Sequence, residues 1–139
     1  MSLKALKATA TKRATGLCEY CKSPANISSQ PFVMEHIIPK SKGGATILEN
    51  IAYSCQGCNN HKYNKTEGLD VATGNRVPLF NPRQQRWDAN FQWSANGLEI
   101  IGISSCGRAT VGTLKLNRSE LKSLRKLLTH FGSHPPPSV

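Results

Sequence analysis

Two short apolar stretches and one hairpin signal dominate the pattern of hydrophobic and polar positions. Residues 30–38 and 47–54 are rich in apolar and β-branched side chains, and prolines bound the first stretch, which is typical of short strands. A polar, basic segment at 59–65 predicts a helix that ends by Gly68. Further on, residues 91–93 and 98–101 flank Asn96-Gly97, a pair that favours a type I′ turn because both residues tolerate positive φ. We therefore expect two strands and a helix in the first half, and a β-hairpin in the second.

The two ends of the chain carry different helical patterns. Residues 2–14 contain several basic side chains and no acidic one, and have little to bury, so they predict either a short basic helix or a frayed tail. Near the other end, Asn117-Arg-Ser-Glu120 resembles a capping box and Gly132 stops the helix that follows it. The apolar positions that share one face of that helix are Leu121, Leu124, Leu127 and Leu128.

Turn-rich residues 70–86 separate the two halves. We expect a basic N-terminal segment at 1–15, a core at 16–68, an extension at 69–132 and a disordered tail at 133–139. Trp87, Phe91 and Trp93 in the extension are typical of a small core, more so than of a platform on which bases stack.

Composition and charge restrict the class of protein. The 139 residues fit one domain, with or without a short appendage, and 38% hydrophobic and 6% aromatic residues predict a core that needs a staple. A formal net charge of +10 favours binding to a polyanion, most often nucleic acid. No apolar stretch has the length of a signal peptide or a membrane span, so we expect a cytoplasmic protein without a membrane partner.

Two C-x-x-C pairs are the strongest chemical signal. Cys18 with Cys21 and Cys55 with Cys58 supply four thiolates, the ligand set of a closed tetrahedral zinc site. Buried structural cysteines and a thioredoxin-type redox pair are weaker readings, the latter because neither pair is expected to begin a helix in a βαβ unit. A zinc ion with four thiolates has no open position, so any chemistry needs a second centre.

Glu35 and His36 lie inside the loop that such a zinc would close, at the exit of the first predicted strand. Successive strand residues face opposite sides, so both side chains reach one site only if the strand bends or bulges there. A lone histidine at a strand end is more often structural. The adjacent carboxylate and the surrounding motifs favour catalysis here, because the ordinary pKa of histidine lies near neutrality.

Together these motifs resemble the HNH endonuclease family in its zinc-stabilised form. The resemblance covers about residues 16–65 and is carried, in order, by Cys18-Glu-Tyr-Cys21, Glu35-His36-Ile-Ile-Pro39, Lys42-Gly43-Gly44, Glu49-Asn50 and Cys55-Gln-Gly-Cys58-Asn59-x-x-Lys62. It implies an α+β fold with a ββα-metal core clamped by the four-cysteine zinc site, followed by a small hairpin and a C-terminal helix. The second half is similar to an extension found behind the core in some small stand-alone bacterial members.

The resemblance also implies roles for individual residues. His36 would be the general base and Asn50 would hold the loop that positions it. Glu35, at a position more often Asp, and Asn59 would bind a divalent ion such as Mg²⁺, Mn²⁺ or Ni²⁺. His61 is the weaker alternative ligand, because residues two apart on a helix do not share a face.

The implied activity is metal-dependent hydrolysis of phosphodiester bonds, with double-stranded DNA as the expected partner. Four lysines around the proposed site would contact its phosphates or form a solvated surface: Lys40, Lys42, Lys62 and Lys65. The alternative is a non-catalytic, zinc-stabilised nucleic-acid-binding module, and a basic interaction protein is a third class. Oligomeric state and cleavage specificity stay open.

Overall fold

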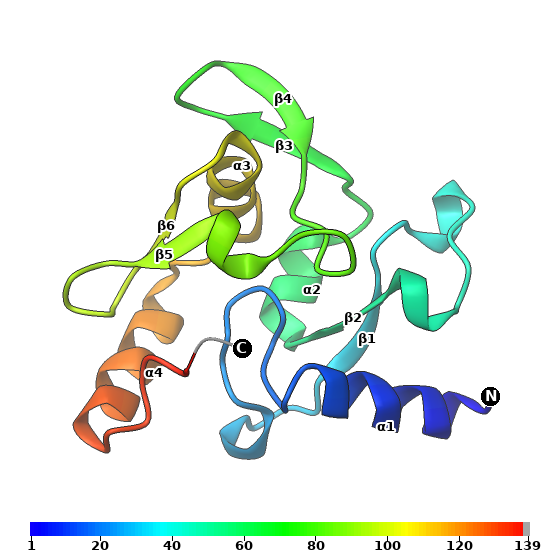
Figure 1. The fold of residues 1–139 in the computed structure, drawn as a ribbon, viewed down its shortest axis with the longest axis horizontal. Coiled ribbons are helices and arrows are strands. Elements are labelled where there is room, and N and C mark those ends of the chain that lie inside the picture. The colour runs from blue at the N-terminus through cyan, green and yellow to red at the C-terminus, as the bar shows by residue number, and fades with distance from the viewer. Residues whose placement is uncertain (138–139) are drawn as a thin grey trace. The chain divides into compact units, whose positions relative to one another are not determined.

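In the computed structural model, which describes residues 1–137, the chain has a mixed α+β fold with four α-helices and three two-stranded antiparallel sheets (Figure 1). It divides into two compact units, the first comprising Met1–Thr66 and Asn81–Gln84, the second Glu67–Phe80 and Gln85–Val139. The α+β class predicted from the sequence is confirmed. The functional bounds proposed above, 1–15, 16–68, 69–132 and 133–139, stay a prediction. Within the described chain, no helix is both long and apolar enough to cross a membrane.

Two strands and a helix form the centre of the first unit. β1 (Val33–His36) pairs antiparallel with β2 (Ile51–Ser54), and α2 (Gln56–Lys62) follows β2 directly. The predicted order is therefore present, although both strands are shorter than the apolar stretches and the helix begins earlier than expected. It begins at Gln56 because the Cys55 side chain caps it, accepting a hydrogen bond from the backbone N–H of Cys58. The second C-x-x-C pair begins this helix in a ββα arrangement, which is not the βαβ unit of a thioredoxin-type redox pair.

The N-terminal basic segment is a helix, α1 (Leu3–Arg13), that contributes to the core of the first unit. Its buried residues Leu6 and Ala10, one turn apart, pack with Ile51 of β2, and the half-buried Met34 and Leu48 lie against them. These two buried positions hold the helix against the core. Because two apolar positions give only a weak pattern, the sequence did not predict that the helix is packed.

The second unit contains two hairpins and two helices. β3 (Glu67–Asp70) pairs with β4 (Asn75–Pro78), and β5 (Phe91–Trp93) pairs with β6 (Ile100–Gly102). The helices are α3 (Ser105–Leu114) and α4 (Ser119–His130). The β5–β6 hairpin and α4 were predicted, whereas α3 and the β3–β4 hairpin were not. Asp70, fully buried, joins β3 to α3 by accepting hydrogen bonds from Arg108 Nε and Nη2 at 2.8 and 2.9 Å.

Three details of the second unit differ from the sequence predictions: the turn type, the helix cap and the exposure of Leu127. Within residues 94–99, Gly97 has a positive φ of 73° but Asn96 does not, so the turn is not type I′. Asn117 does not cap α4, whose N-cap is Arg118, because the Asn117 amide is bonded to the backbone N–H and C=O of Ile100. Leu127, predicted on the buried face of α4, is 55% exposed.

The end of the chain is described as far as residue 137. His134 Nε2 lies 2.7 Å from the backbone oxygen of Gly97. Residues 138 and 139, the end of the tail predicted to be disordered, lie outside the described residues.

Candidate active site and metal cluster

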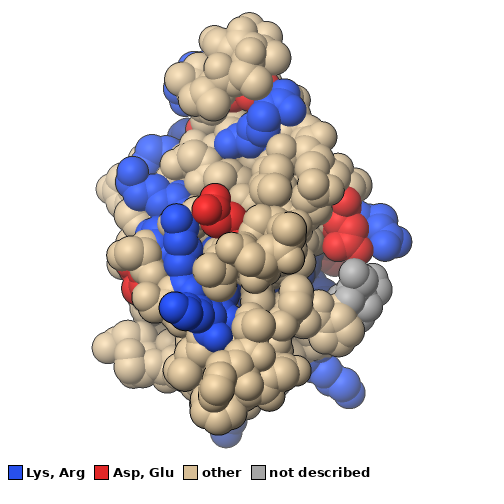
Figure 2. Space-filling model, turned by 90° about the vertical axis from the view of Figure 1, so that its left-hand side faces the viewer, with Lys and Arg blue, Asp and Glu red and all other residues tan. Residues whose placement is uncertain are grey.

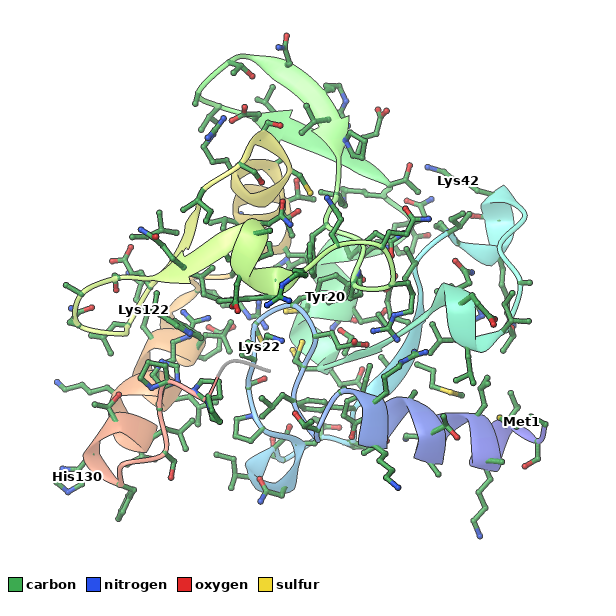
Figure 3. The ribbon with its side chains drawn as sticks, in the orientation of Figure 1. Met1, Tyr20, Lys22, Lys42, Lys122 and His130 are labelled. Carbon is green, nitrogen blue, oxygen red and sulfur yellow. The ribbon has the colours of Figure 1, made fainter. Side chains whose placement is uncertain are left out.

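The four paired cysteines form one buried cluster in the first unit. Their Sγ atoms all lie within 4.8 Å of one another. Cys18 Sγ accepts a hydrogen bond from the backbone N–H of Cys21, as Cys55 Sγ does from Cys58, so both pairs have the same knuckle geometry. Figure 3 shows the sulfur atoms between the loop that carries Lys22 and helix α2. Cys106, half-buried in the second unit, does not belong to the cluster.

The cluster is compatible with a structural zinc ion. Burial raises the pKa of the Cys18 thiol, because a charged thiolate loses its solvation there. Four thiolates therefore stay together in this position only with a cation between them, and binding of that cation releases protons. Among residues 1–137, no other group of three or more His, Cys, Asp or Glu side chains brings its ligand atoms together in this way.

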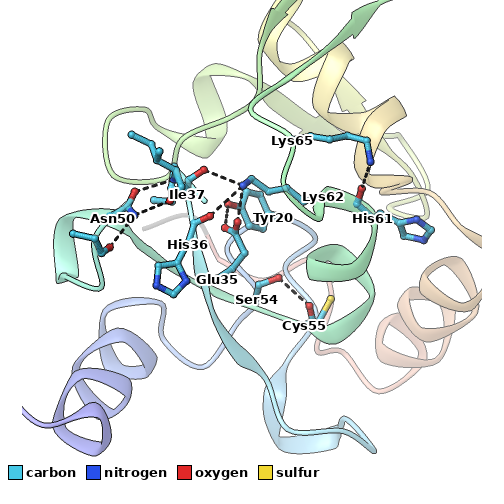
Figure 4. Close-up of polar contacts among 12 residues, drawn as sticks. Tyr20, Glu35, His36, Ile37, Asn50, Ser54, Cys55, His61, Lys62 and Lys65 are labelled. Carbon is cyan, nitrogen blue, oxygen red and sulfur yellow. Dashed lines mark hydrogen bonds and ion pairs between the residues drawn. The ribbon is translucent and has the colours of Figure 1, made fainter. Parts of the chain in front are cut away.

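Glu35 lies in a closed network of hydrogen bonds on the α2 side of the β1–β2 hairpin (Figure 4). Its carboxylate accepts a hydrogen bond from Lys62 Nζ at 2.5 Å on one oxygen and from the Tyr20 hydroxyl at 2.7 Å on the other. Lys62 Nζ also donates to the backbone oxygens of Ile37, at 3.0 Å, and His36, at 3.4 Å. Burial raises the pKa of Glu35, while Lys62 and Tyr20 act in the opposite direction.

His36 lies on the other face of the same hairpin. The ladder is regular, with Glu35 opposite Ala52 and His36 opposite Ile51, and contains no bulge. Ile51 packs against α1, whereas Glu35 faces Lys62 of α2. The structure therefore does not bring the Glu35 and His36 side chains together, because the bend that would have been needed is absent from β1.

The imidazole of His36 is half-buried and has one polar partner. His36 Nε2 lies 2.8 Å from Thr46 Oγ1. Burial lowers the pKa of His36, and the positive charges of Lys40 and Lys62 lower it further. The ring is therefore neutral at pH 7 and able to accept a proton. No motif in the sequence pointed to Thr46.

Asn50 closes the loop that leads from β1 to Thr46. Its Oδ1 accepts a hydrogen bond from the backbone N–H of Ile38 at 2.9 Å, and its Nδ2 donates to the oxygens of Ile38 and Ala45 at 3.0 and 2.9 Å. Gly44 packs so closely beneath this bridge that a Cβ there would lie 1.7 Å from the Ile38 oxygen. Asn50 thus holds the segment between His36 and its partner Thr46.

Residues 18–65 match the HNH endonuclease family model. This segment is an HNH domain. It contains the four-cysteine cluster, the β1–β2 hairpin and α2, so the resemblance drawn from the motifs is confirmed. Searches among curated proteins and among solved structures gave no significant match.

Two candidate ligands on α2 of the HNH domain differ in orientation. Asn59 is half-buried and precedes Lys62 by three residues, so the two share a helix face. Within residues 1–137 the Asn59 amide has no hydrogen-bond partner. The His61 ring points away from Glu35 (Figure 4).

The four lysines expected to contact nucleic acid do not form one surface. Lys40, Lys42 and Lys65 are exposed, as a phosphate-contacting role requires. Lys62, in contrast, is 1% exposed and paired with Glu35. The prediction that it contributes to a basic surface is therefore wrong, because its charge compensates a buried carboxylate.

The sequence did not predict roles for three further residues of the first unit: Glu19, Tyr20 and Arg83. Tyr20 and Glu19 lie between the first two cysteines, in a motif whose spacing predicts a role only for the thiols. Glu19 Oε2 accepts a hydrogen bond from the backbone N–H of Tyr53 at 2.8 Å, and its other oxygen forms an ion pair with Arg83. Arg83 belongs to the segment Asn81–Gln84, which returns to the first unit from outside the HNH motif.

The bridge made by Asn50 predicts a specific loss of stability. We expect Asn50→Ala to lower the free energy of unfolding by about 1–3 kcal/mol, because the three hydrogen bonds from the buried Asn50 amide to the backbone of Ile38 and Ala45 are lost. Asn64→Ala, at an exposed position of the same unit, should change it by less than about 0.5 kcal/mol. Urea unfolding of the metal-loaded protein measures both. Equal stability of the two variants would contradict the bridging role.

Proposed function

We propose that the HNH domain hydrolyses phosphodiester bonds of nucleic acid, with His36 as the general base. The substrate that we propose is double-stranded DNA. The observation that carries this proposal is the half-buried neutral imidazole of His36, in contact with Thr46, within a segment that matches the HNH endonuclease family.

The proposed step needs a base and an oriented water molecule. A neutral His36 takes a proton from water as the water oxygen forms a bond to phosphorus and the bond to the leaving oxygen breaks. Thr46 Oγ1 lies 2.8 Å from Nε2. This contact shows the position at which an oxygen atom can form a hydrogen bond with the His36 ring. Asn50 fixes the loop and so limits the movement of both groups. Its contribution is positioning.

For the cysteine cluster we propose a structural zinc ion. The residues fit it: four buried sulfur ligands with their atoms within 4.8 Å of one another suit a closed tetrahedral site. The ion would join the first knuckle to the start of α2 and so close the chain around β1 and β2. With four thiolates it would supply folding energy and leave hydrolysis to other groups.

A second, catalytic ion is a separate proposal that the residues do not fit as they stand. The resemblance suggests Mg²⁺, Mn²⁺ or Ni²⁺ on Glu35 and Asn59, with His61 as the weaker alternative. Both oxygens of Glu35 are already bonded to buried donors, and the His61 ring points away from Glu35. We therefore derive no step through this ion.

Charge supports a nucleic-acid partner. The formal net charge is +10, and Lys40, Lys42 and Lys65 are exposed in the HNH unit. On the face shown in Figure 2, basic side chains cover more of the surface than acidic ones do. Such a surface favours phosphate contacts and salt-sensitive binding. A non-catalytic nucleic-acid-binding module would bind equally well, and the occupied Glu35 carboxylate favours this second candidate.

Cleavage of supercoiled plasmid separates the two candidates. We expect His36→Ala to lower the nicking rate at least about 100-fold, because the general base is lost. His130→Ala, an exposed histidine of α4, should nick at the wild-type rate. The lowered pKa of His36 means that its neutral form increases as the pH rises to the ordinary value of 6.5, so the wild-type rate should rise over this range and level off above it.

Plasmid binding without nicking by the wild-type protein, or equal nicking by wild type and His36→Ala, would contradict the enzymatic proposal. The first result would leave the binding module as the function.

Metal analysis tests the zinc proposal. After dialysis against EDTA, the wild-type protein should retain about one zinc per chain. Cys58→Ser should lose zinc and unfold more readily, because three thiolates remain, whereas Cys106→Ser, outside the cluster, should retain it. A zinc-free wild-type protein with an unchanged circular dichroism spectrum and melting temperature would contradict the proposal.

A further inference from the structure

Lys62 is buried to a degree that lysine reaches only when it is paired. It is 1% exposed. An ammonium group has three N–H donors, and Lys62 has three acceptors: the Glu35 carboxylate at 2.5 Å, the Ile37 oxygen at 3.0 Å and the His36 oxygen at 3.4 Å. Each N–H therefore has an acceptor within the protein, and none is directed to a phosphate.

The Glu35 carboxylate is equally closed. It is 3% exposed, and the oxygen that does not face Lys62 accepts a hydrogen bond from the buried Tyr20 hydroxyl. A Mg²⁺-like ion requires short oxygen contacts and keeps several waters in its coordination shell. To bind Glu35 it would have to expel the ammonium and admit water to a pocket that excludes it.

The other two members of the proposed ligand set, Asn59 and His61, do not provide a substitute carboxylate. Asn59 shares the helix face of Lys62 but offers a neutral amide, and the His61 ring points away from Glu35. Protein sites for Mg²⁺ normally include one or two carboxylates. Glu35 is thus the one carboxylate in the proposed ligand set, and Lys62 holds it.

We propose that Lys62 is the resident cation of this HNH domain. Its ammonium fills the position beside Glu35 that a divalent ion would need, so Glu35 is a partner of Lys62 and not a metal ligand. By binding the carbonyl oxygens of His36 and Ile37, Lys62 is a positioning residue for the backbone that carries the imidazole. The role assigned to His36 rests on the proposed nuclease function, whereas the competition between Lys62 and an ion does not.

A titration with Mn²⁺, followed by the electron paramagnetic resonance signal of the free ion, tests this proposal on zinc-loaded protein. Wild type should bind no Mn²⁺ through Glu35 up to millimolar concentrations. Lys62→Met keeps the carboxylate and removes the ammonium, so it should gain one Mn²⁺ site. The double variant Glu35→Gln/Lys62→Met, in which the pair is neutral, should lose that site again. Wild-type Mn²⁺ binding that Glu35→Gln abolishes, or a folded Lys62→Met without a new site, would overturn the proposal.

A second measurement needs no variant. In wild-type protein labelled with ¹⁵N, the buried Lys62 ammonium should give a side-chain signal that exchanges slowly with water, and Mn²⁺ should leave it sharp. Paramagnetic loss of that signal, at Mn²⁺ concentrations that leave the backbone amide signal of the exposed Lys4 sharp, would place the ion at Glu35 and overturn the proposal. Absence of plasmid nicking would defeat the proposed function and leave both metal experiments decisive for the ion pair.

Discussion

A buried carboxylate is stable only when hydrogen bonds or an opposite charge compensate it, and in the HNH domain Glu35 is such a carboxylate. Its two partners come from separate elements: Tyr20 from the first cysteine knuckle and Lys62 from α2, while Glu35 itself belongs to β1. Removing one member of such a pair costs about 3–5 kcal/mol, because the other charge stays buried alone. The pair therefore connects the same elements as the cysteine cluster, and β1 is held between them.

Because successive residues of a strand face opposite sides, the buried pair and the proposed base lie on different faces of the β1–β2 hairpin. Glu35 points to α2, and its neighbour His36 lies on the face where Ile51 packs against α1. Since Lys62 also binds the carbonyl oxygens of His36 and Ile37, the same interaction fixes the backbone of the proposed base. The side chain of His36 is left with Thr46, in a segment whose course Asn50 determines. Rigid support on one face of the hairpin and an imidazole held by Thr46 on the other is the arrangement that the proposed general base requires.

Local spacing predicted much of this unit, and tertiary pairing accounts for what it missed. The C-x-x-C pairs predicted one four-cysteine cluster, and the apolar stretches predicted two strands followed by a helix. Lys62 was misread, since a lysine in a basic helix is usually solvated and its buried partner lies 27 residues earlier in the chain. The prediction of a capping box at Asn117 was wrong because of another tertiary contact: the Asn117 amide is bonded to the backbone of Ile100 in β6. Helix α3, with two glycines and few large apolar residues, carries too weak a pattern to predict.

The position of the Lys62 ammonium is the central claim, and a crystal structure grown in excess Mn²⁺ tests it most directly. Anomalous diffraction identifies the ion independently of its surroundings. The account predicts Lys62 Nζ bonded to Glu35 and to the Ile37 carbonyl oxygen, with no anomalous peak on the Glu35 carboxylate. A Mn²⁺ ion coordinated by Glu35, with the Lys62 side chain turned out of the pocket, would contradict it.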